Sequence, residues 1–169
     1  MDDSFEDLLA VDHHGALEFF ALGLRDAADG EVDRDELLYN ASVLAHYSQV
    51  STVSDTDYPA PANLSFVFDQ FVVGAELAGD SATMEVAGAQ CLLLAGFFQD
   101  QMRGRFNLNW YATLGAGFFR RAAAQEASAR KAQLLDAVGR RFEPWRQTHA
   151  RLGRELRDRP YLLPRRPDV

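Results

Sequence analysis

Two apolar runs, separated by a short polar and basic segment, dominate the middle of the chain. The first run covers residues 86–98 and is apolar on every side of a helix except at Gln90, and the second covers residues 108–119. A helix that is apolar all round is normally buried by neighbours on every side. Small residues spaced three or four apart let two such helices approach closely. In the first run these are Ala87, Gly88, Cys91, Ala95 and Gly96, and in the second Ala112, Gly115, Ala116 and Gly117. We therefore expect a central helical hairpin.

The segments around this hairpin have helical rather than strand periodicity. Apolar residues recur at three- and four-residue spacing over 4–25, 34–50 and 64–78. Helix-forming residues predominate over 122–157, where Pro144 should kink or divide the helix. Residues 51–62 are rich in Ser, Thr, Asp and Pro and predict a loop. The sequence thus predicts an all-α fold. We expect a single-domain helical bundle of about five to six helices over residues 1–157, followed by an extended Pro- and Arg-rich tail at 158–169.

The formal net charge of −8 conceals a division of charge along the chain. Residues 1–100 carry nineteen acidic residues and two arginines, a net charge of −17. Residues 101–169 carry fourteen arginines and one lysine against six acidic residues, a net charge of +9. One interpretation is that the two parts pack together and neutralise each other. The others are head-to-tail self-association, an acidic protein partner for the basic part, and nucleic-acid binding.

The composition predicts a cytoplasmic protein that is not inserted in a membrane. Cys91 is the only cysteine and lies in an apolar run, so we expect an inert buried thiol in a reducing compartment. The N-terminal residues are acidic where a secretory signal would carry positive charge. The longest apolar run, of about 13 residues, is shorter than the roughly 20 that span a bilayer.

The segment Asp29–Glu36 resembles the second half of an EF-hand calcium loop. It has an acid before Gly30, an apolar residue two positions after it, and a Glu six positions after it. Arg25 and Ala27, however, stand where the first and third ligands of an intact loop would be. The same letters predict a helix boundary, with Gly30 ending one helix and Asp33 capping the next. We therefore predict no metal and no cofactor.

The sequence contains no Gly-rich phosphate loop, metal-ligand quartet or nucleophile elbow. No catalytic residue is assigned, and we expect a non-enzymatic protein-interaction or regulatory module. Its partner is expected to be another protein or a second copy of the chain. The residues assigned to partner binding lie in the basic C-terminal part: Arg140, Arg141, Trp145, Arg146, Arg151 and Arg154.

Two alternative functions stay open at this point. The first is a ligand-binding or catalytic bundle with a pocket formed by His46, Tyr47, Trp110 and Tyr111. Within it, His46 is expected to be a hydrogen-bonded core residue, with a general base as the other interpretation. The second is binding of single-stranded nucleic acid to the C-terminal Arg helix, where aromatic residues interleave with arginines. This second alternative is not favoured, because the acidic part of the chain would repel phosphate.

Overall fold

The computed structural model describes residues 3–53, 80–104 and 106–158, and within the first range it describes the side chains of residues 15–48. These residues are helical apart from short turns and one isolated β-bridge between Arg103 and Phe106, which confirms the all-α prediction. The predicted helix at 64–78 lies outside the described residues. So does the tail predicted at 158–169, apart from Asp158, which is the last residue of α8. In chain order the helices are α1 (Asp3–Ala27), α2 (Arg34–Val53), α4 (Ser81–Leu92), the π-helical segment η1 (Leu93–Phe97), α5 (Gln99–Met102), α6 (Leu108–Gln125), α7 (Ala129–Arg140) and α8 (Phe142–Asp158).

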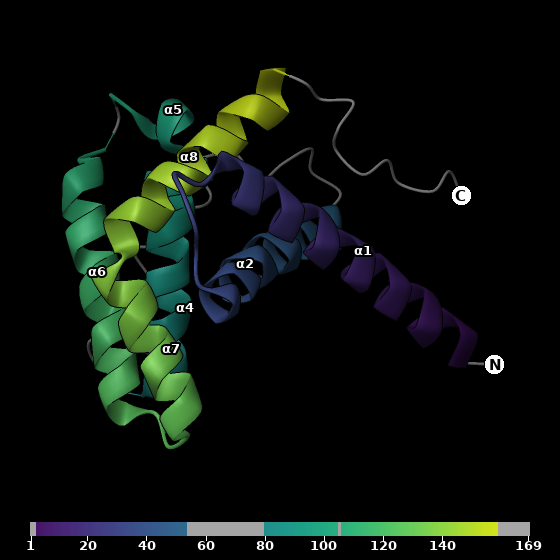
Figure 1. Ribbon diagram of the computed structural model, residues 1–169, viewed down its shortest axis with the longest axis horizontal. Coiled ribbons are helices and arrows are strands. Elements are labelled where there is room, and N and C mark those ends of the chain that lie inside the picture. Colours follow the sequence, from purple (N-terminus) through teal and green to yellow (C-terminus); the bar gives the residue numbers. More distant parts are fainter. Residues whose placement is uncertain (1–2, 54–79, 105, 159–169) are drawn as a thin grey trace.

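The helices are arranged around the predicted central hairpin. Helices α4, α6 and α7 stand side by side, and α1 and α2 form a second pair beside them (Figure 1). Helix α8 continues from the end of α7 and runs past η1 to α1, so it joins the two groups. The most extensive packing in the described part of the chain is between α4 and α6. None of the described helices is both long enough and apolar enough to cross a bilayer.

Small residues bring α4 and α6 together, as the sequence predicts. A Cβ atom added at Gly115 would lie 2.5 Å from Cys91 Cβ and 2.8 Å from two atoms of the Phe142 ring. One added at Gly88 would lie 3.0 Å from the ring of Phe119. Cys91 itself is fully buried, as expected. Glycine at these two positions therefore lets α4 and α6 pack more closely than a Cβ atom would allow.

The first apolar run does not continue as a regular α-helix. It widens into the π-helical segment η1, where the Phe98 N–H donates to the Leu93 carbonyl oxygen at 2.9 Å. Helix α8 crosses at this point. A Cβ on Gly96 would lie 3.1 Å from His149 Cβ, and one on Gly153 would meet the Phe97 carbonyl oxygen. A π-turn inside an α-helix is frequently found at functional sites. In this structure α8 packs against η1.

The ends of the helices follow local signals in the sequence. Gly30 has a φ of +105° in the turn between α1 and α2. The carboxylate of Asp33 accepts a hydrogen bond from the Glu36 N–H at 3.1 Å, so the helix-boundary interpretation of this segment is confirmed. Asp80 caps α4 in the same way through the Thr83 N–H, at 3.0 Å. Pro144 lies in the first turn of α8, where its missing N–H is tolerated.

The predicted helix at 122–157 is divided at two places rather than one. The expected division near Pro144 falls between α7 and α8, at Arg141. The other falls at residues 126–128, where Ser128 caps the start of α7 by accepting from the Lys131 N–H at 3.4 Å. This second turn separates the basic segment from α6 and lets α7 fold back against it.

Candidate functional site

An open groove of about 660 Å³ lies between the α1–α2 turn and the start of α8. We call it the acidic groove, because five carboxylates and two guanidinium groups line it. Its uncharged lining comes from Ala28, Val32, Pro144, Trp145, Gln147 and Thr148. The acidic side chains are Asp29, Glu31, Asp33, Glu36 and Glu143, and the basic ones are Arg141 and Arg151.

Glu36 is the most buried acid of the groove, with 2% of its surface exposed. Its carboxylate accepts two hydrogen bonds from one guanidinium group: Arg141 Nε donates to Oε1 at 2.7 Å, and Arg141 Nη2 donates to Oε2 at 2.6 Å. Trp145 Nε1 also donates to Oε1, at 3.1 Å. The hydrogen bond with Glu36 raises the pKa of Arg141 above its usual value. A paired, charge-assisted contact of this kind fixes both the position and the plane of the carboxylate.

A buried chain of polar groups leads from Glu36 into the core. The Asn40 side-chain N–H donates to the Glu36 carbonyl oxygen at 2.8 Å, and Asn40 Oδ1 lies 2.9 Å from His149 Nε2. Because the Asn40 oxygen can only accept, His149 carries its proton on Nε2. His149 Nδ1 has no hydrogen-bond partner among the described residues. Burial lowers the pKa of His149 to about 3, so the ring is neutral at pH 7.

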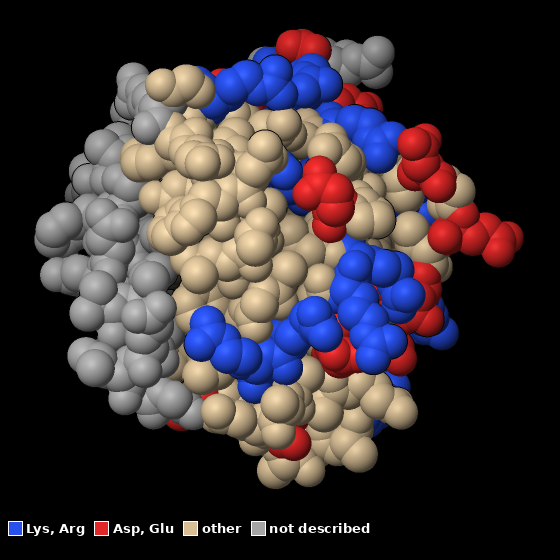
Figure 2. Space-filling view, turned by 90° about the vertical axis from the view of Figure 1, so that its left-hand side faces the viewer, with Lys and Arg blue, Asp and Glu red and all other residues tan. Residues whose placement is uncertain are grey.

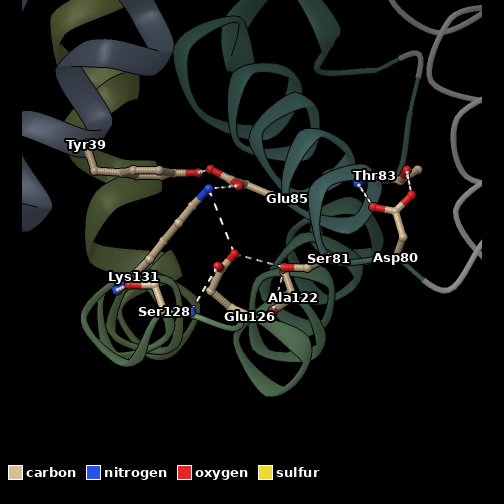
Figure 3. A network of polar contacts seen from close by, with 9 residues as sticks. All are labelled: Tyr39, Asp80, Ser81, Thr83, Glu85, Ala122, Glu126, Ser128 and Lys131. Carbon is tan, nitrogen blue, oxygen red and sulfur yellow. Dashed lines mark hydrogen bonds and ion pairs between the residues drawn. The ribbon is translucent and has the colours of Figure 1, made fainter.

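A second polar cluster joins α2, α4, α6 and α7 (Figure 3). The Tyr39 hydroxyl donates to Glu85 Oε1 at 2.9 Å, and Lys131 Nζ lies 3.0 Å from Glu85 Oε2 and 3.9 Å from Glu126 Oε2. Ser81 Oγ donates to the Ala122 carbonyl oxygen at 2.9 Å. Burial raises the pKa of Tyr39, and the hydrogen bond with Glu85 raises that of Lys131.

Tyr39 and Lys131 therefore keep their protons at neutral pH. A protonated Lys131 is not a nucleophile, and a protonated Tyr39 is not a base. The hydrogen bonds and ion pairs of this cluster connect α2, α4, α6 and α7. Lys131 is the chain's single lysine, and the sequence places it in a charged, exposed segment. In the structure it is paired with Glu85.

The structure distributes the six residues predicted for partner binding over three kinds of position. Trp145 and Arg146 are buried, and Arg146 donates from Nε to the Ala95 carbonyl oxygen in η1 at 2.9 Å. Arg141 and Arg151 line the acidic groove. Arg140 and Arg154 have largely exposed side chains that form ion pairs.

Most of these ion pairs connect the basic part of the sequence to its acidic part. Arg151 lies 3.2 Å from Asp29, and Arg154 lies 3.0 Å from Asp100, which Arg157 also approaches at 2.7 Å. On the face shown in Figure 2, the basic side chains lie in separate groups, with acidic side chains beside most of them, around a broad uncharged area. Within the described residues, the two parts of the chain thus neutralise each other at several points.

Of the four residues predicted to line a ligand pocket, Trp110 and Tyr111 lie together on α6. Trp110 is 52% exposed and its ring packs edge-on against Tyr111, with centroids 4.9 Å apart. Tyr47 packs edge-on against Phe98 at 5.4 Å. The small hollow beside Tyr111 is lined by neither His46 nor Tyr47, and it has no room for a water molecule.

The prediction that His46 is a core residue is wrong. His46 is exposed on α2, whose buried positions are Glu36, Asn40, Ala41, Leu44 and Ala45. Among the described side chains the buried histidine is His149, for which no role was predicted. The sequence does contain a signal for it, because His149 belongs to a series spaced alternately three and four apart. The members of this series are all buried: Phe142, Trp145, His149, Leu152 and Leu156.

Three observations on the described residues concern metal binding and nucleophilic chemistry. No group of three or more potential metal ligands occurs among them, and the Glu36 carboxylate is already paired. Burial raises the pKa of the Cys91 thiol, so it is not poised as a nucleophile. Comparison of the chain with protein-family models, with curated proteins and with solved structures finds no match.

Proposed function

We propose that this protein is a non-enzymatic interaction module that binds a basic segment of a partner protein in the acidic groove. The observation that carries the proposal is the lining of the groove, in which carboxylates outnumber guanidinium groups by five to two. The sequence predicts partner binding at the basic C-terminal arginines. Those arginines are already paired within the chain, with Asp29, Glu36 and Asp100, so we place the partner in the groove instead.

The groove suits a peptide with both charge and some apolar surface. Asp29, Glu31 and Asp33 are exposed on the turn between α1 and α2, where they attract cations from solution. Val32 and Pro144 supply apolar lining. Complementary charge mainly raises the association rate and the selectivity, so we expect a salt-sensitive interaction rather than a very tight one. The single buried thiol is consistent with the cytoplasm as the compartment in which this takes place.

A labelled peptide of about ten residues, rich in Arg and Lys, tests the proposal by fluorescence anisotropy. Glu31→Arg should weaken binding several-fold, because it reverses a charge that lines the groove. Glu155→Arg is the matched control, since it makes the same change of net charge at an exposed position of α8 that does not line the groove. Binding should also weaken between about 50 and 500 mM NaCl, as the screening length shortens. Equal effects of the two variants would place the peptide elsewhere.

A small cationic molecule is the second candidate occupant of the groove. Its volume of about 660 Å³ lies within the range of about 300–1,000 Å³ that is typical of small-molecule sites. The same titration with a polyamine in place of the peptide separates the two candidates. Light scattering at low and high salt detects a second copy of the chain as the partner. Tight binding of a single-stranded oligonucleotide with a steep salt slope would favour the nucleic-acid alternative.

A further inference from the structure

We infer that Glu36 is the anchor for an arginine side chain of the partner, and that Arg141 occupies this position in the free protein. The inference rests on the proposed function and names the chemistry that the groove selects. Glu36 is 2% exposed, yet it forms part of the wall of an open groove. The side chain that pairs with it is 55% exposed. A buried acceptor is thus covered by a donor that reaches in from solvent.

The geometry around Glu36 is specific for a guanidinium group. Both carboxylate oxygens are used by two nitrogens of one planar group, at 2.7 and 2.6 Å. Trp145 Nε1 holds Oε1 from a separate direction, at 3.1 Å, and so keeps the carboxylate in this plane. A guanidinium group offers two parallel donors to such a carboxylate, whereas the ammonium group of lysine is a point charge and cannot make both contacts.

The position of Arg141 allows another guanidinium group to displace its side chain from Glu36 while the helices stay folded. It is the residue between α7 and α8, and its own backbone N–H is already bonded to the Ala137 carbonyl oxygen. Its side chain can therefore turn into solvent while the backbone stays in place. Exchange with another guanidinium keeps Glu36 paired, whereas release without exchange would leave a buried charge unpaired. The groove should accordingly exchange one arginine for another and reject an occupant that lacks one.

Chemical rescue of the Arg141→Ala variant tests the anchor without any partner. Arg141→Ala and its control, Arg140→Ala, are made in a Trp110→Phe background, which leaves Trp145 beside Glu36 as the only tryptophan. Methylguanidinium at tens of millimolar should raise the melting temperature of Arg141→Ala by several degrees and change the Trp145 emission. Methylammonium at the same ionic strength should do neither. Arg140→Ala is the control that neither cation should rescue, because the largely exposed Arg140 side chain pairs with Asp136 and not with a buried carboxylate.

Peptide binding to the parent protein tests the same anchor in a protein that needs no rescue. A peptide with arginines should bind at least tenfold more tightly than the same peptide with lysines, and Arg141→Ala should bind the arginine peptide more tightly than the parent does. Equal binding of the two peptides, or equal rescue by the two cations, would overturn the anchor and leave the proposed groove standing. If neither peptide binds to the parent or to Arg141→Ala, the proposed function and the anchor both fail.

Discussion

Replacing Gly115 by alanine should destabilise the protein, although alanine is the better helix former. The added Cβ would lie 2.5 Å from Cys91 Cβ and 2.8 Å from the Phe142 ring. Carbon atoms in contact are normally about 3.5–4.0 Å apart, so α4 or the ring must move by about 1 Å. The Phe142 ring is 3% exposed and packs against Phe119, which leaves it little room. Overpacking of this kind costs about 1–3 kcal/mol.

Gly117→Ala on the same helix isolates this cost. No heavy atom lies within 4 Å of the Cβ position of Gly117, so alanine there should only bring the gain in helix propensity, about 1 kcal/mol. Both variants share this gain, and their difference in unfolding free energy is the overpacking itself. Urea unfolding followed by circular dichroism should give a difference of about 1–3 kcal/mol, or roughly 2–12 °C in Tm. Equal stabilities would show that α4 and α6 are not in close contact.

Three further predictions concern polar residues of the core and surface. Burial lowers the pKa of His149 to about 3, below the value of about 6.5 for an unfolded chain, so this ring should make stability fall from about pH 6.5 toward pH 3 by up to about 1.4 kcal/mol per pH unit. In urea titrations His149→Gln should remove this part of the pH dependence and leave the part that comes from paired carboxylates such as Asp100. Arg141→Glu should cost about 3–5 kcal/mol, because it sets a carboxylate against the buried Glu36. Arg140→Glu, which breaks an exposed pair, should cost at most about 1 kcal/mol by the same measurement. Tyr39→Phe should cost about 1 kcal/mol, because its acceptor on α4 keeps the ion pair with α7.

The sequence was most informative where a structure depends on near neighbours in the chain. The end of α1 near Gly30, the cap at Asp33 and the cap at Asp80 all use residues within three or four positions of each other, and all were predictable. The π-helical segment was not. An apolar run offers no residue that separates a π-turn from a continued α-helix, and α8, which packs against this one, lies about 50 residues away in the sequence.

The charge division along the chain was visible in the sequence, but its pairings were not. Arg141 and Glu36 are separated by 105 residues, and Arg154 and Asp100 by 54. Composition alone gives no preference among the many acidic residues with which a C-terminal arginine can pair. For that reason Arg140 and Arg141 looked equivalent, although one forms an exposed pair within its own helix and the other covers a buried carboxylate.

The polar residues between α2 and α8 have a structural consequence that the apolar ones do not. Glu36 and Asn40 are one turn apart on α2, and Arg141, Trp145 and His149 follow at the same spacing on the other side of the contact. A shift of α8 by one turn would place one apolar side chain where another had been. It would separate His149 from Asn40 and leave buried groups unpaired, each at a cost of about 1–3 kcal/mol. We infer that these hydrogen bonds fix the register of α8 against α2. The shape of the acidic groove depends on that register, since its two walls are the start of α8 and the turn that leads into α2.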